Sequence, residues 1–132
     1  MEIITAKDLT KDYDGFRAVD RVNFTIVSGE CFGFLGPNGA GKTTIMRILY
    51  CFMPPTGGEV KVLGHDVTKD PSLVKSRIGV MPQDDSLDPD LSVLQNLVVY
   101  ARYFDIPKKR SSVMAKDLLG SVGLSEKMNA NI

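Results

Sequence analysis

The nine residues GPNGAGKTT, from Gly36 to Thr44, decide the fold of this 132-residue chain. Three of the six positions from 36 to 41 are glycine, and glycine loses more backbone freedom on folding than any other residue type. So much flexibility in one place indicates a tight backbone turn with a shape that side chains would forbid.

The segments on either side predict a strand before the turn and a helix after it. CFGFLG, at Cys31–Gly36, is continuously apolar, as is typical of a strand covered on both faces in a parallel sheet. IGVMPQ, at Ile78–Gln83, has the same character. Lys42–Phe52 has helical periodicity, and its apolar stripe consists of Ile45, Met46, Ile48, Leu49 and Phe52.

The turn matches the phosphate-loop pattern G-x-x-x-x-G-K-[ST], filled by Gly36, Gly41, Lys42 and Thr43. In such a loop, backbone N–H groups surround a polyphosphate and the lysine reaches its β- and γ-phosphates. The Thr43 hydroxyl is the expected Mg²⁺ ligand, and Thr44 is expected to donate to the α-phosphate. This motif therefore predicts binding of a nucleotide with Mg²⁺.

Donors to the phosphates are expected to begin after Pro37, because proline has no N–H. We therefore expect Asn38, Gly39 and Ala40 to join the cofactor-binding residues, together with the free N–H groups at the start of the next helix.

Alternating segments elsewhere predict an antiparallel layer. Ile3–Leu9 and Val22–Val27 read as strands, with a hairpin turn at Asp14-Gly15, and residues 59–64 read as another short strand. With the buried runs and helices between them, the fold class is α/β. No linker divides the chain, so residues 1–132 are expected to belong to one domain.

The C-terminal part predicts two helices. Ser92 and Gln95 form a capping box that opens a helix to about Phe104. A last helix is expected from Pro107 to about Gly120.

The composition narrows the classes of function. The 16 basic and 16 acidic residues balance, which gives no reason to expect nucleic acid as partner. A single histidine, His65, makes a Cys/His zinc site improbable. The N-terminus has no secretory pattern, and no window reaches 18 apolar residues without charge.

GPNGAGKTT, followed by PPTGGEVKVLGHDV and IGVMPQ, resembles the ATP-binding subunit of ABC transporters. The spacing T-x-G-x-V-x-V-x-G-x-D, from Thr56 to Asp66, adds to the resemblance, which runs along the whole chain from Ile3. It implies a P-loop NTPase with a RecA-like parallel core and an antiparallel β layer, and ATP and Mg²⁺ as ligands.

The resemblance also assigns roles to single residues. Tyr13 matches the aromatic residue that stacks on adenine, and Val19 matches an apolar position near the sugar and base. Gln83 matches the glutamine that contacts Mg²⁺ and the attacking water. Lys42 and Gln83 are thus the expected catalytic residues, and Thr43 and Gln83 the expected metal ligands.

The stretch LDPDLSVLQNLVVYARYFDIP, residues 87–107, is most similar to the exporter branch that moves drugs, antibiotics or nodulation factors. The expected partners are a second ATP-binding subunit and a transmembrane permease, with the protein on the cytoplasmic face of a membrane. The family's signature, Walker B strand and switch histidine do not occur in the 132 residues, so we expect an N-terminal fragment of one ATP-binding domain that hydrolyses ATP only within the complete protein.

Three alternatives stay open. A soluble ABC-type ATPase of DNA repair or translation often has insertions after the phosphate loop and basic faces, whereas here that segment is short and the charge neutral. Another P-loop enzyme, such as a metabolite kinase, would not need Tyr13 or Gln83. The last alternative is a non-catalytic interaction module.

Overall fold

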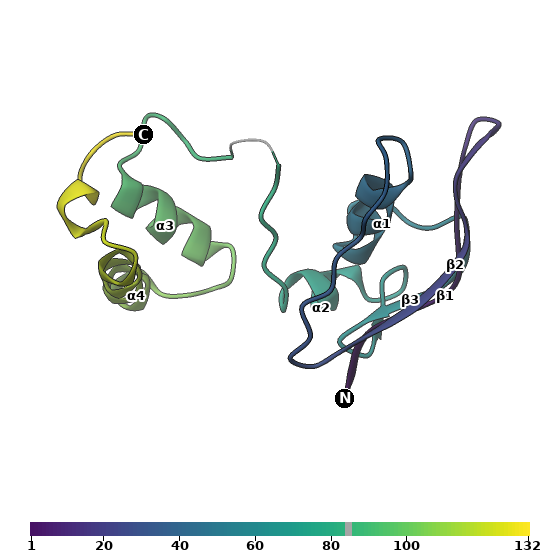
Figure 1. Ribbon diagram of the computed structural model, residues 1–132. Helices are drawn as coiled ribbons and strands as arrows, with labels where there is room; N and C mark the ends of the chain where they lie inside the picture. The colour runs from purple at the N-terminus through teal and green to yellow at the C-terminus, as the bar shows by residue number, and fades with distance from the viewer. Residues whose placement is uncertain (84–85) are drawn as a thin grey trace. The chain divides into compact units, whose positions relative to one another are not determined.

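The computed structural model describes residues 1–83 and 86–132, which form two compact units, Met1–Val80 and Met81–Ile132 (Figure 1). The first unit holds an antiparallel sheet with helices, and the described residues of the second form helical elements, connecting segments and one isolated β-bridge. Each unit is described by itself below.

The sheet of the first unit has four strands in the order β2-β1-β3-β4. They are β1 (Glu2–Tyr13), β2 (Phe16–Val27), β3 (Gly57–Val62) and β4 (His65–Asp66), and every neighbouring pair is antiparallel. The predicted strands are confirmed, although β1 and β2 are longer than the alternation alone indicated. The hairpin turn between them lies at Asp14-Gly15, as predicted, and both residues have positive φ.

Helices α1 (Lys42–Leu49) and α2 (Pro71–Lys75) lie on the same side of this sheet (Figure 1). They close one apolar core, which contains Ala6, Leu9, Val19, Ile45, Ile48, Leu49, Val60, Val62, Val67 and Val74. The prediction of an inward stripe was wrong at two positions, since Met46 is 46% and Phe52 67% exposed. The helix ends at Leu49 with Tyr50 as its C-cap, so Phe52 no longer follows helical periodicity.

The two apolar runs predicted as buried parallel strands, Cys31–Gly36 and Ile78–Gln83, form no ladder in the described residues, so this prediction was wrong. Leu35 is 98% exposed and Met81 93% exposed. A strand is defined by its hydrogen bonds to a neighbouring strand. An apolar run can place side chains in a core even where no strand lies beside it to form those bonds. The described part of the chain therefore contains the antiparallel layer of the predicted α/β fold and its helices.

The second unit contains α3 (Val93–Arg102), α4 (Lys108–Ser121) and the 3₁₀ turn η1 (Ser125–Lys127). The capping box is confirmed: Gln95 N donates to Ser92 Oγ at 3.2 Å, and Ser92 N donates to Gln95 Oε1 at 2.8 Å. Pro107 is the N-cap of α4. The C-terminal segment pairs with the start of α3 through a bridge between Ser92 and Asn131.

A buried asparagine fixes the segment that leads into α3. Asn96 is 2% exposed, and its amide nitrogen donates to the carbonyls of Asp88, Leu91 and Ser92 at 2.9 to 3.3 Å. Its Oδ1 accepts from Asp88 N at 2.9 Å. Because both ends of this amide are satisfied, its burial carries little penalty.

Candidate functional site

The predicted phosphate loop lies in the first unit, between β2 and α1. It turns at Pro37 and Ala40, where Ala40 N donates to Pro37 O at 3.3 Å. Asn38, Gly39 and Ala40 are exposed, so the backbone between Pro37 and α1 is accessible from solvent.

Gly41 fixes how the loop meets the sheet. Its φ is 84°, in the left-handed region, and it is the N-cap of α1. A Cβ at this position would lie 2.5 Å from the carbonyl oxygen of Ala18 and 3.2 Å from Cγ2 of Val19. Glycine is therefore required here both by backbone conformation and by the close approach of β2.

The start of α1 has features that favour negative charge nearby. No side chain caps this helix, and no acidic residue lies in its first turn. The ladder of α1 begins with Ile45 N donating to Gly41 O at 2.9 Å, which leaves the first N–H groups of the helix without an intrahelical acceptor. Together with the positive end of the helix dipole, such groups favour negative charge.

The Lys42 ammonium crosses the loop. Its Nζ donates to the carbonyl oxygens of Gly36 and Pro37, both at 2.7 Å. An ammonium group has three donors, so the third remains for another acceptor. The cation thus stands beside the loop backbone, where the motif requires it to meet phosphate oxygens.

Thr43 and Thr44 follow on the first turn of α1. Thr43 is exposed and Thr44 is half-buried. The Thr43 hydroxyl is an oxygen donor of the type that Mg²⁺ accepts, and Mg²⁺ usually needs few protein ligands because it keeps several waters. The described residues contain no group of three His, Cys, Asp or Glu side chains that could hold a metal ion by themselves.

Tyr13 lies at the end of β1, in the same unit as the loop. The residue is 39% exposed. The phenol oxygen donates to Met53 Sδ at 3.1 Å, and the Lys11 ammonium lies 5.5 Å from the ring centroid. The ring is therefore supported and partly open to solvent, as a stacking surface must be, and its role toward adenine stays a prediction.

Val19 and Gln83 have different surroundings from the loop residues. Val19 is 4% exposed and belongs to the core, directly under Gly41; it supports the helix start, and its predicted contact with sugar and base stays a prediction. Gln83 is exposed and belongs to the second unit, and its predicted contact with Mg²⁺ and water also stays a prediction.

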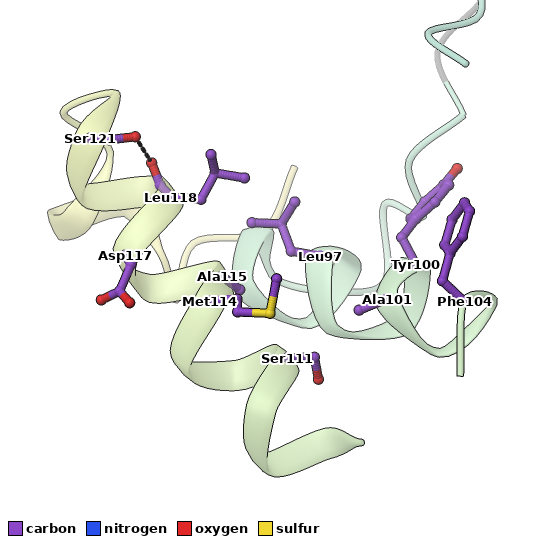
Figure 2. A pocket seen from close by; sticks show the side chains of 10 residues that line it. All are labelled: Leu97, Tyr100, Ala101, Phe104, Ser111, Met114, Ala115, Asp117, Leu118 and Ser121. Carbon is purple, nitrogen blue, oxygen red and sulfur yellow. Dashed lines mark hydrogen bonds between the residues drawn. The ribbon is translucent and has the colours of Figure 1, made fainter. Parts of the chain in front are cut away.

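A groove of the second unit has a different chemistry. It lies between α3 and α4, has a volume of about 610 Å³ and is lined mainly by apolar side chains such as Leu97, Phe104 and Met114 (Figure 2). Two of its polar groups are satisfied locally, since Ser111 Oγ donates to Lys108 O and Ser121 Oγ to Leu118 O. It offers nothing that would bind a polyphosphate.

Sequence reasoning missed Lys11 and Met53 as neighbours of Tyr13. Met53 lies 40 positions away from Tyr13, and no local pattern links the two. The only available signal was the position of Lys11 on the same strand face, two residues before Tyr13, because side chains alternate along a strand.

No helix in the described residues is long and apolar enough to cross a bilayer.

The chain is 39% identical over 132 residues to the Nod factor export ATP-binding protein I of Rhizobium etli, covering all of this chain and 42% of that relative. The chain thus spans less than half the length of that protein.

Two solved structures have similar folds. The ATP-binding subunit of an ABC transporter aligns with a TM-score of 0.85 and 22% identity, over 98% of this chain and 54% of its own. The dimeric structure of a post-hydrolysis state of an ATP-binding cassette bound to ADP and Pi aligns with a TM-score of 0.82 and 25% identity, over 98% of this chain and 61% of its own.

These likenesses confirm the predicted fold class. The model of the family described as ABC transporter matches residues 19–132, which include the whole phosphate loop and both helices of the second unit. The chain belongs to the ABC transporter family.

Proposed function

We propose that this chain binds MgATP at the loop Gly36–Thr44 and that the complete protein hydrolyses ATP to drive export across a membrane. The observation that carries the proposal is the start of α1: Gly41 seats an uncapped helix end against β2, and the Lys42 ammonium stands beside it. This places positive charge and free N–H donors in one small exposed loop, which suits a polyphosphate.

Lys42 has the largest electrostatic role in this proposal. On binding, its ammonium exchanges neutral carbonyl acceptors of the loop for charged phosphate oxygens. A hydrogen bond to a charged group contributes about 1.5–3 kcal/mol net. The backbone N–H groups of residues 38–44 orient the phosphate chain, and Thr44 donates to the α-phosphate.

Thr43 would hold Mg²⁺ through its hydroxyl, with Gln83 as a further oxygen ligand in the complete protein. When bound, the metal neutralises charge on the β- and γ-phosphate oxygens. Gln83 orients the attacking water through its amide, which adds no charge. Tyr13 presents its ring to adenine, and Val19 supports the loop beside the sugar and base.

The direction of transport and the partners are inferred from the relatives. The relatives of this chain include a protein named for Nod factor export, and we infer an exporter, with its specificity carried by a transmembrane permease. A structural neighbour is a dimeric ATP-binding cassette, which supports a second ATP-binding subunit as partner. The site for ATP then lies on the cytoplasmic face of the membrane, and nucleic acid is not a partner.

The test is the substitution Lys42→Ala in the complete protein, with binding of MgATP followed by titration calorimetry and turnover by phosphate release. Loss of 1.5–3 kcal/mol corresponds to about 10- to 150-fold weaker binding. Lys61→Ala, at an exposed position of β3, is the matched control and should leave both measurements unchanged. Unchanged affinity and turnover in Lys42→Ala would refute the proposal.

A further inference from the structure

The end of β1 is tied to the segment that follows α1. Asp12 N donates to Thr56 Oγ1 at 3.0 Å, and Thr56 N donates to Thr10 O at 2.9 Å. Lys11 Nζ donates to Pro54 O at 2.8 Å. The chain thus leaves the phosphate loop through α1 and returns at once to the strand that carries Tyr13.

Two side chains contact the Tyr13 ring: Lys11 on the same strand and Met53 in the segment that follows α1. Met53 Sδ accepts a hydrogen bond from the Tyr13 phenol O–H at 3.1 Å. The Lys11 ammonium lies over the ring at 5.5 Å from the centroid, within the range of a cation–π contact. Because Lys11 is itself anchored to Pro54, its ammonium is not free to follow a moving ring.

Part of Tyr13 remains open to solvent beside these contacts. The Lys11 ammonium lies over one face of the ring, and the residue is 39% exposed. A flat base can stack on the opposite face without needing a particular hydrogen bond. A ring that rotates freely presents this face for only part of the time, and affinity falls in proportion to the competent fraction.

We propose that Lys11 and Met53 are positioning residues for Tyr13, which hold its ring so that the base of an adenine nucleotide stacks on the face away from Lys11. The inference rests on the proposed function, because it takes Tyr13 as the partner of the base. It adds that base recognition depends on a cation and a thioether that contact the tyrosine rather than the nucleotide.

The experiment separates the base from the phosphates. Lys11→Met, Met53→Leu and Tyr13→Phe are made in the complete protein, and binding of MgATP is compared with binding of magnesium tripolyphosphate. Lys11→Met keeps the apolar stem without the charge, and Met53→Leu keeps the bulk without the sulfur. Each variant should bind MgATP about two- to fivefold more weakly, in line with one cation–π contact or one weak hydrogen bond. Tripolyphosphate affinity should not change.

A double-mutant cycle tests whether Met53 acts through the phenol oxygen. Met53→Leu added to Tyr13→Phe should cause no further loss of ATP affinity, because the first change has already removed the hydrogen bond. Lys7→Met, an exposed position of the same strand, controls for loss of a positive charge and should change neither affinity.

Three outcomes would overturn the positioning role: unchanged ATP affinity in Lys11→Met and Met53→Leu, additive losses in the cycle, or equal weakening of ATP and tripolyphosphate. The last would mean that the contacts only stabilise the fold. Lys42→Ala, measured beside them, tells the two proposals apart. If it weakens both ligands while the other variants do not, only the positioning role fails; if it weakens neither, the proposed function fails. Should Met53→Leu not fold, Lys11→Met and Tyr13→Phe still decide the matter.

Discussion

Gly41→Ala should destabilise the first unit more than Gly39→Ala, a change in the same phosphate loop. The residue has φ 84°, and an L-residue in the left-handed region costs about 1–2 kcal/mol. The added Cβ would also lie 2.5 Å from the Ala18 carbonyl oxygen, a contact that can be relieved only by moving α1 away from β2. Overpacking of this kind costs about 1–3 kcal/mol. The expected loss of unfolding free energy is the sum, about 2–5 kcal/mol.

Gly39 offers a matched control in the same loop. Its φ is 85°, almost the same, but a Cβ there would meet nothing within 4 Å. Gly39→Ala should therefore cost only the conformational part, about 1–2 kcal/mol. Gly15→Ala, at φ 89° and also in open space, measures the same part at the hairpin turn, far from the loop in sequence.

The assay is urea unfolding of the complete protein without nucleotide, followed by circular dichroism. Gly41→Ala should lose about 1–3 kcal/mol more than Gly39→Ala, since only Gly41 meets the backbone of β2. Equal losses at the two positions would refute the claim that the close approach of Gly41 to β2 determines the position of α1. A larger loss at Gly39 would refute it as well.

Two further predictions concern titrating groups. Hydrogen bonds from the Thr68 hydroxyl and backbone N–H hold the pKa of Asp66 below its ordinary value, so the ionised form is favoured by folding. The contribution of Asp66 to the free energy of unfolding is complete above about pH 4 and is lost as the pH falls through its lowered pKa. Asp66→Asn should therefore reduce the loss of stability at low pH, measured by unfolding between pH 2 and 6. The same loss in the variant would contradict the assignment. Burial raises the pKa of Cys51, whereas Cys31 is exposed, so iodoacetamide at pH 8 should label Cys31 first, as peptide mass spectrometry would show; faster labelling of Cys51 would speak against its burial.

Local signals in the sequence were sufficient for the loop, the hairpin and the capping box. Each of these depends on residues close together in the chain, such as Asp14-Gly15 or Ser92 and Gln95, whose preferred backbone conformations are the same in isolation and in the fold. For this reason their positions could be predicted to within a residue or two.

The failures share one cause, which is dependence on distant residues. Cys31–Gly36 has the composition of a buried strand, but composition does not supply a hydrogen-bonding neighbour. The end of α1 at Leu49 left Phe52 exposed, which the periodicity did not indicate. The neighbours of Tyr13 were likewise hidden, since Met53 reaches it only after the chain has passed through the loop and α1.

Lys42 gives the loop a kinetic property. Its ammonium bridges the carbonyls of Gly36 and Pro37, so one side chain joins two points of the loop backbone. In the proposed binding of MgATP, the phosphate oxygens replace these two acceptors when one flexible side chain rotates. Side-chain rotations of this kind take picoseconds to nanoseconds, roughly a thousandfold or more faster than microsecond loop closures, so entry and exit of ligand would not wait on this loop.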